Sequence, residues 1–255
     1  MKFDCPPAGF VARRLPRAWA WLRPKMERPL LDAWNKAGRE LRLSEVARRH
    51  PQSRRFHGRQ PVFAAPFPRE GILVVRTCAH GGWWGRFAGD LYRGPSRVLR
   101  EIRAGESLLG RKIPTPRIEA VIFYPAGPFC RIEVVTRLVP ESLDLVECLA
   151  RRPAPGQRSK ILLAVRKLLG QLGRCGVRHP DLNARNILLS PGPHGWIAHL
   201  LDVDAISLGE PSLPSTDRAN RNRLLRSLFK RSRLGDLGCS ETEVTRIWKE
   251  LFPRS

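Results

Sequence analysis

Apolar residues recur along the chain at helical spacing in one stretch and as short continuous runs in several others. Between 161 and 172 they fall on one face of a helix, and the members of that face are Ile161, Leu162, Val165, Leu168, Leu169 and Leu172. The runs at 61–65 and 71–77 flank Pro68-Arg69-Glu70-Gly71, which predicts a hairpin. Further runs predict strands near 117–124, 131–138, 187–189 and 196–202.

Helix signals divide the rest of the chain. Pro95 and Ser96 open a helix whose apolar residues share one broad face. A basic helix is expected over about 216–232, and the capping box Ser240-Glu241-Thr242-Glu243 predicts a last helix. We therefore expect an α+β fold in three parts. These are a basic, Trp- and Arg-rich N-terminal extension (1–55), a small antiparallel β lobe with one helix (56–139) and a mainly helical large lobe (140–255).

Composition narrows the class of partner. The 255 residues include 46 Lys and Arg against 23 Asp and Glu, which gives a formal net charge of +23. Such a surface attracts polyanions, whether nucleic acid, anionic lipid headgroups or a phosphorylated or carboxylated substrate. The six cysteines have no C-x-x-C spacing and none lies near a histidine at a ligand spacing. We expect buried, reduced thiols and neither a disulfide framework nor a zinc site.

The sequence also limits how the chain meets a membrane. No apolar run reaches the roughly 18 residues of a membrane span, and the N-terminus lacks an apolar core of signal-peptide type, so a cytoplasmic protein is expected. Trp19, Trp21 and Trp34 lie among arginines in the first 55 residues. This composition is typical of contact with a membrane interface, and equally of an irregular extension whose tryptophans pack on the domain.

The residues that carry chemistry gather in the loop His179-Pro180-Asp181-Leu182-Asn183-Ala184-Arg185-Asn186, and Asp202 follows the next apolar strand. A kinase-like fold builds its phosphoryl-transfer site from an Asp, an Asn five residues later and a second Asp after a strand. Asp181 is the expected catalytic base. Asn186 and Asp202 are expected to hold Mg²⁺ against the ATP phosphates.

Two neighbouring residues have structural interpretations. His179 is expected to brace the loop from behind rather than to transfer protons. Asp204 is either a second metal ligand or a solvated turn residue, and we favour the turn.

A kinase also needs a cation for the α and β phosphates of ATP. No lysine occurs between Lys36 and Lys112, so the usual strand lysine is missing. Arg76, near the end of the predicted strand, takes its place, with Glu101 on the following helix as its expected partner and Glu106 as a weaker candidate. An arginine makes the same ion pair with a different geometry. The alternative for Arg76 is a solvent-facing strand residue.

These residues resemble the lipopolysaccharide kinase family, which includes the 3-deoxy-D-manno-octulosonic acid (Kdo) kinases and the heptose kinases, and the Kdo kinases most of all. The resemblance extends over about 58–232 and is strongest in the loop 176–186 and in Leu201-Asp202-Val203-Asp204. The other segments that carry it are Val74-Val75-Arg76, Ala79-His80-Gly81-Gly82-Trp83, Asp90-Leu91-Tyr92, Ser96-Arg97-Val98-Leu99-Arg100-Glu101, the stretch 109–116 and the basic helix 221–230.

The resemblance implies a two-lobed, protein-kinase-like fold that uses ATP and Mg²⁺ to phosphorylate a sugar hydroxyl. By transfer this is the 4-hydroxyl of Kdo on the lipid A–inner core precursor, at the cytoplasmic face of the inner membrane. The positive charge suits that anionic acceptor and surface, and no nucleic acid is expected as a partner. Four arginines of the basic helix either bind the acceptor's anionic groups or form a solvated face: Arg218, Arg221, Arg223 and Arg226.

Other activities remain open at this point. Pro180 and Asn183 replace an Arg and a Lys of protein kinases, which favours a small or lipid-linked acceptor over a protein. One alternative is a kinase for heptose, another small alcohol or a protein. Another is a non-catalytic basic module on a kinase scaffold, because the strand lysine is missing and Gly58-Arg59-Gln60 is a poor substitute for a Gly-rich phosphate loop.

Overall fold

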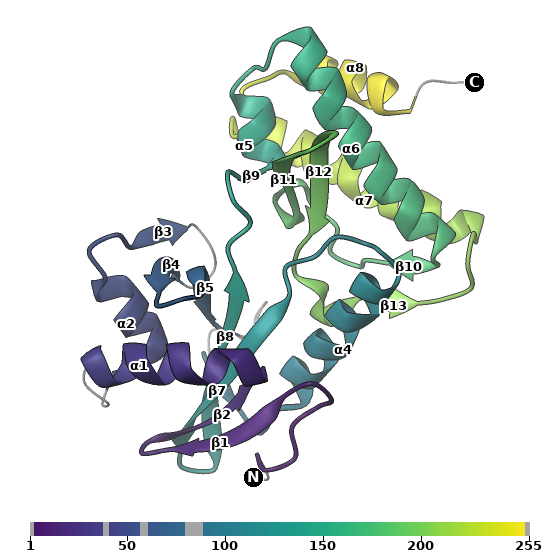
Figure 1. Ribbon diagram of the computed structural model, residues 1–255. Helices are drawn as coiled ribbons and strands as arrows, with labels where there is room; N and C mark the ends of the chain where they lie inside the picture. Colours follow the sequence, from purple (N-terminus) through teal and green to yellow (C-terminus); the bar gives the residue numbers. More distant parts are fainter. Residues whose placement is uncertain (1–2, 38–40, 57–60, 80–88, 253–255) are drawn as a thin grey trace. The chain divides into compact units, whose positions relative to one another are not determined.

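The computed structural model describes residues 3–37, 41–56, 61–79 and 89–252 (Figure 1). The chain divides into two compact units. Unit 1 comprises Met1–Ile102 and Arg117–Leu138, and unit 2 comprises Arg103–Pro116 and Val139–Ser255. One boundary therefore falls inside helix α4 (Ser96–Gly110).

Unit 1 is built on an antiparallel sheet. In the described part of the chain its strands run in the order β1-β2-β7-β8-β5-β4-β3, with β6 also paired to β8. Their bounds are β1 (Val11–Leu15), β2 (Ala18–Leu22), β3 (Arg54–Phe56), β4 (Val62–Phe67), β5 (Gly71–Thr77), β6 (Leu91–Tyr92), β7 (Ile118–Ala126) and β8 (Phe129–Arg137). The predicted hairpin is confirmed as β4–β5, and the strands predicted near 117–124 and 131–138 are β7 and β8.

The central strands of this sheet are apolar on both faces. Because successive side chains of a strand point to opposite faces, Leu22 belongs to one buried cluster while its neighbour Trp21 belongs to another. On β7, Ile122 and Phe123 are divided in the same way. The first cluster also contains residues from α1 (Glu27–Ala37) and α2 (Leu43–Arg49), and the second contains residues from α4. This double burial is why these strands appear as continuous apolar runs in the sequence.

The first 55 residues contribute strands β1 and β2 to this sheet. Strand β2 pairs with β7, with Trp21 opposite Val121. Trp21 is fully buried and its indole N–H donates to the backbone oxygen of Phe3 at 2.8 Å. Trp34 on α1 is 7% exposed and donates to the backbone oxygen of Leu41 at 2.7 Å. Of the two roles considered for these tryptophans, packing on the domain is the one that the structure shows for this pair. Helices α1 and α2 are additions to the single helix expected in the small lobe.

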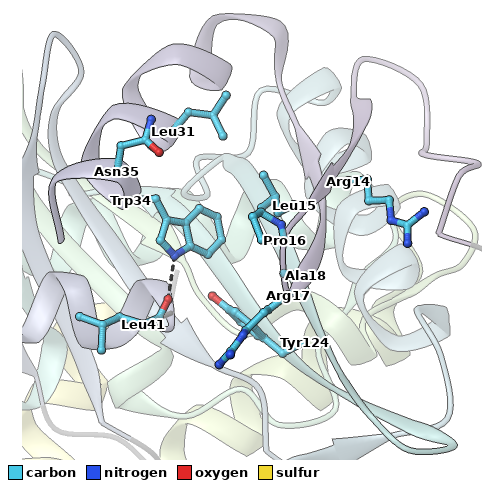
Figure 2. Close-up of a pocket in the computed structure, with 10 residues that line it drawn as sticks. All are labelled: Arg14, Leu15, Pro16, Arg17, Ala18, Leu31, Trp34, Asn35, Leu41 and Tyr124. Atoms are coloured by element: carbon cyan, nitrogen blue, oxygen red, sulfur yellow. Dashed lines mark hydrogen bonds between the residues drawn. The ribbon is translucent and has the colours of Figure 1, made fainter. Parts of the chain in front are cut away.

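A cavity of about 280 Å³ lies where the β1–β2 turn meets α1 (Figure 2). Trp34 and Tyr124 supply its aromatic wall, and the turn residues Leu15 and Pro16 supply apolar surface. Figure 2 shows the guanidinium group of Arg14 directed away from the indole of Trp34. Arg17 and Asn35 also line the cavity, so the gap where the hairpin meets the helix is mainly but not wholly apolar.

Unit 2 is mainly helical. Its helices are the second half of α4, α5 (Leu145–Ala150), α6 (Pro155–Arg174), α7 (Pro214–Arg233) and α8 (Glu241–Leu251). Its strands are β9 (Leu143–Asp144), β10 (Val177–Arg178), β11 (Ile187–Gly192), β12 (Gly195–Leu200) and β13 (Ser207–Leu208), and β11 pairs with β12 and β9 while β10 pairs with β13. One apolar cluster joins these elements, and α7 and α8 lie along α6 in Figure 1.

The helix predictions in this unit are confirmed. All six apolar residues that define the predicted face of α6 are buried. Helix α8 begins with the expected capping box, in which Ser240 accepts from the backbone N–H of Glu243. A second capping box, between Asp144 and Glu147, opens α5, a helix that the apolar pattern did not reveal. Among the described residues, no helix is both long enough and apolar enough to cross a membrane.

Candidate active site

The candidate catalytic loop begins directly after α6. Gly176 has a positive φ of 64°, and a Cβ at this position would lie 2.4 Å from the backbone oxygen of Gly209. No residue with a side chain fits so close an approach. The glycine therefore lets β10 pair with β13 and sets the direction in which the chain enters the loop.

His179 links two parts of the site. Its ring is 1% exposed, and its Nε2 lies 3.1 Å from the backbone oxygen of Leu201. Its Nδ1 accepts from the backbone N–H of Asp181 at 3.2 Å. This pair of contacts assigns the proton to Nε2. The ring joins the loop to the residue before Asp202, which is the bracing position that the sequence predicts.

Two buried polar side chains of α7 hold the loop at both ends. The backbone N–H of His179 donates to Oδ1 of Asn220 at 3.0 Å, and Nδ2 of Asn220 donates to the backbone oxygen of Val177 at 2.8 Å. Two turns later, Oγ of Ser227 accepts from the backbone N–H of Ala184 at 3.0 Å. Sequence reasoning missed both residues. Their signal is that they occupy the same buried face of α7 as Leu224, where a polar side chain needs a partner.

Asp181 and Asn186 are brought together by the loop itself. Nδ2 of Asn186 donates to the backbone oxygen of Asp181 at 2.9 Å, and Nδ2 of Asn183 donates to the same oxygen at 3.1 Å. The side chain of Asp181 is exposed. The amide nitrogen of Asn186 is used in this contact, which leaves its oxygen as the atom suited to a cation. The loop thus fixes the backbone of Asp181 while its carboxylate faces solvent.

Asp202 lies beside Asn186 at the end of the β11–β12 hairpin. The strand pairing places Ile187 opposite Leu200, and the backbone N–H of Leu201 donates to the backbone oxygen of Asn186 at 2.8 Å. Asp202 itself has φ 56° and ψ 54°, the left-handed conformation. Asp is among the few residue types that adopt it at moderate cost. Asp204 follows in the 3₁₀ turn Val203–Ala205, where the sequence places a turn residue.

In unit 1, Arg76 forms the ion pair that the sequence predicts. It lies on β5, and its Nη2 donates to Oε1 of Glu101 on α4. Glu101 is 6% exposed, and its second carboxylate oxygen is buried with no hydrogen-bond partner within the described part of the chain. Nη1 of Arg76 lies 3.8 Å from Sγ of Cys78. Arg76 is therefore a half-buried, paired cation and not a solvent-facing strand residue.

The four candidate arginines of α7 differ in how far their charge is already used in contacts within the chain. Arg221 pairs with Asp217 at 2.7 Å, and its guanidinium lies 4.1 Å from the ring centre of Phe252. Its charge is therefore already engaged. The other three candidates, Arg218, Arg223 and Arg226, are exposed.

The donors fit a magnesium ion that shares nucleotide phosphates. In the portion that the structure describes, no group of three or more His, Cys, Asp or Glu side chains could hold a metal ion by itself. Asn186 and Asp202 offer oxygen atoms only, and Mg²⁺ commonly takes one or two protein ligands and completes its shell with phosphates and water. The segments around Gly81 and around Gly58 lie outside the described residues.

Comparisons with known proteins identify a family model and relatives that this chain matches. The family model described as "Lipopolysaccharide kinase (Kdo/WaaP) family" matches residues 65–250. A 3-deoxy-D-manno-octulosonic acid kinase of Xanthomonas oryzae pv. oryzae is 36% identical over 172 residues, which are 65% of this chain and 64% of the relative. One from Stenotrophomonas maltophilia is 34% identical over the same length, with the same coverage of both chains. The chain thus spans somewhat less than two thirds of the length of these relatives.

A solved structure shows the same fold. The chain titled "WaaP in complex with acyl carrier protein" superposes with a TM-score of 0.51 over 90% of this chain and 88% of that one, at 16% sequence identity. The fold is therefore α+β and protein-kinase-like, as predicted. With the family match over most of its length, the chain belongs to the lipopolysaccharide kinase (Kdo/WaaP) family.

Proposed function

We propose that this chain transfers the γ-phosphoryl group of ATP to a sugar hydroxyl of a lipopolysaccharide precursor. The curated relatives that it matches are Kdo kinases, which makes the 4-hydroxyl of Kdo on the lipid A–inner core precursor the acceptor that we propose. The observation that carries the proposal is the loop of unit 2. There His179 and Asn186 hold the backbone of Asp181, Asn220 holds the backbone of His179, and the Asp181 side chain is left exposed.

Asp181 is the proposed catalytic base. An exposed carboxylate on a fixed backbone can accept or orient the proton of an incoming hydroxyl. Two amides hold the backbone oxygen of Asp181, and the His179 ring holds its N–H. The loop therefore limits where the carboxylate can point, and such positioning is most of what catalysis of phosphoryl transfer requires.

Asn186 and Asp202 are the proposed ligands of Mg²⁺. When bound, the ion neutralises charge on the phosphate oxygens of ATP. The hairpin puts both residues at the same end of β11 and β12, and the contact between Leu201 and Asn186 fixes their spacing. One neutral and one charged oxygen ligand leave room for phosphates and water.

Arg76 is the proposed contact for the α and β phosphates, with Glu101 as the residue that holds it. Burial of Glu101 keeps the carboxylate in place beside Arg76, and a guanidinium carries five N–H donors in a planar fork. Arginine binds phosphate through two parallel N–H groups, which lysine cannot do. The substitution of Arg for Lys is thus compatible with nucleotide binding.

The acceptor is proposed to be anionic and lipid-linked. Arg218, Arg223 and Arg226 are exposed on α7 and available to its phosphates or carboxylates, whereas Arg221 is engaged internally. Such an acceptor lies in an anionic membrane, so we propose that the protein works peripherally on the cytoplasmic face of the inner membrane. The net charge of +23 supports that location.

The direct test is transfer of label from γ-labelled ATP, in the presence of Mg²⁺, to Kdo–lipid A. Asp181→Ala and Asp202→Ala should each reduce the rate by at least about 10²-fold. Glu210→Gln, which removes an exposed acid of unit 2 outside the loop, is the control and should leave the rate unchanged.

Two outcomes would redirect the proposal. If label enters a heptose-containing acceptor or a protein, and not Kdo–lipid A, the chain is a kinase with a different acceptor from the one proposed. Absence of transfer to any acceptor, together with no ATP-induced rise in melting temperature, would favour a non-catalytic basic module.

A further inference from the structure

Helix α6 carries an unusual distribution of charge. Its twenty residues contain no Asp or Glu, whereas each of the other α-helices that the structure describes contains at least one. One face packs into the core of unit 2. The opposite face holds the exposed residues Lys160, Leu163, Arg166, Lys167 and Arg174.

The cations of this outward face have no internal partner among the described residues. Arginines on two other helices pair with an acid of their own helix: Arg48 with Glu45 on α2, and Arg246 with Glu243 on α8. On α6 itself, Arg158 lies nearer the core and pairs with Glu250. An external anion would therefore meet the outward cations without breaking an existing ion pair, so that their attraction is not offset by a lost contact.

The spacing of these charges selects an extended partner. From Lys160 to Arg174 the row covers about 21 Å, at 1.5 Å per residue. A single phosphate contacts one or two side chains, whereas a row of this length suits a surface that bears many charges. Leu163, 39% exposed, lies one turn after Lys160 and one turn before Lys167. An apolar side chain among lysines and arginines is the pattern of a helix that lies in a membrane interface.

We infer that the outward face of α6 is a docking surface for an anionic bilayer. Cations near an anionic leaflet attract it, and Leu163 reaches the boundary between headgroups and acyl chains. The inference deepens the proposed function, on which it rests, because it names the surface by which the enzyme meets the membrane that carries its acceptor. The buried Trp21 and Trp34 do not supply that contact.

The test measures binding and not catalysis. The full chain is sedimented with phosphatidylcholine vesicles that contain or lack phosphatidylglycerol, at low and high salt. We expect binding that requires phosphatidylglycerol and weakens with salt. Lys160→Gln combined with Lys167→Gln should weaken it about 25-fold, since each cation contributes about 5-fold. Leu163→Asn should weaken binding at both salt concentrations.

A matched pair of substitutions serves as the control. Lys36→Gln combined with Lys249→Gln removes the same charge from exposed positions on α1 and α8 and should change binding little. Melting temperatures check that each variant is folded. The assay is repeated with Asp181→Asn, which separates docking from phosphoryl transfer, because binding should survive even where transfer is lost.

Three results would overturn the inference. The first is absence of binding to phosphatidylglycerol vesicles by the wild-type chain. The second is equal loss of binding in the α6 pair and in the control pair, which would mean that net charge alone attracts the bilayer. The third concerns Lys160→Gln combined with Lys167→Gln. If this variant still binds the vesicles but no longer binds a nucleic acid duplex that the wild-type chain binds, the face recognises a different polyanion. If binding fails while transfer to dispersed Kdo–lipid A proceeds, only the docking surface is wrong.

Discussion

The backbone N–H of His179 donates to Oδ1 of Asn220 at 3.0 Å, and both groups are buried. The same Asn220 side chain donates to the backbone oxygen of Val177 at 2.8 Å. Asparagine is suited to this position because it offers an acceptor and a donor together. Asn220→Ala leaves both backbone groups unpaired in the core, and each unpaired group costs about 1–3 kcal/mol. We therefore expect Asn220→Ala to lower the free energy of unfolding by about 1–3 kcal/mol for each of the two groups, as measured by denaturant titration.

Catalysis should respond in a particular way to this substitution. If Asn220 positions Asp181 through the loop, kcat should fall more than KM for ATP rises, because Arg76, the proposed contact for the α and β phosphates, belongs to unit 1. Asn220→Asp keeps the acceptor for His179 and loses the donor for Val177, so it should lie between Asn220→Ala and wild type in kcat. Asn222→Ala, on the exposed side of α7, is the control. A parallel change in kcat and KM would assign Asn220 a general structural role only.

The ion pair between Arg76 and Glu101 gives the second prediction. Removal of Glu101 leaves Arg76 without the carboxylate that orients it, so Glu101→Gln should raise KM for ATP more than it lowers kcat. Arg76→Lys keeps the charge with a different reach and should retain part of the activity. A double-mutant cycle on kcat/KM should give a coupling free energy of about 1–3 kcal/mol. A coupling near zero would show that the two residues act independently.

The sequence was sufficient for elements whose side chains repeat with a clear period. The apolar face of α6, the β4–β5 hairpin and the capping box of α8 were all foreseen. The elements of the first 55 residues were not, because they are short and prolines or arginines lie within or next to them. Strand β2 pairs with β7, about 100 residues later in the chain. A local pattern carries no information on such distant pairing.

The same distinction holds for the candidate site. Asp181, Asn186 and Asp202 were identifiable because their spacing along the chain reflects one loop and one hairpin. The ion pair of Arg76 was foreseen from charge and element order. Asn220 was missed because it lies on α7, more than 40 residues after His179. Its role appears only when that helix packs against the loop. The catalytic roles of these residues stay predictions until activity is measured.

Asp202 provides the third prediction because its backbone is left-handed, with φ 56°. This conformation costs most L-residues roughly 1–2 kcal/mol, but Asn little and Gly nothing. Asp202→Asn and Asp202→Gly should therefore unfold at nearly the wild-type denaturant concentration, while Asp202→Ala should lose about 1 kcal/mol. The activity should follow a different order. Asn keeps an oxygen for Mg²⁺ and should retain residual transfer, whereas Gly and Ala should retain none measurable. If Gly and Asn variants are equally active, Asp202 is not a metal ligand.

Glu133 gives the last prediction. It lies on β8, fully buried, and accepts from the backbone N–H of Ser44 at 3.2 Å and from the hydroxyl of Tyr124 at 2.8 Å. Burial raises the pKa of Glu133 above its ordinary value of 4.5, and the hydrogen bonds from Ser44 and Tyr124 offset this in part. In the pH range between the two pKa values, the folded state therefore holds a proton that the unfolded state has released.

This difference in proton binding fixes the sign of the effect on stability. The contribution of protonated Glu133 is complete below 4.5 and is lost as pH rises through the raised pKa of the folded state. Glu133→Gln is neutral at every pH, can accept from Tyr124 and can donate to the hydroxyl of Ser44. The difference in unfolding free energy between Glu133→Gln and wild type should therefore grow in favour of the variant as pH rises from about 4.5 toward neutrality. Denaturant titrations across that range, with Glu210→Gln as the exposed control, measure it. A difference that is constant with pH would mean that Glu133 has the same pKa in the folded and unfolded chain.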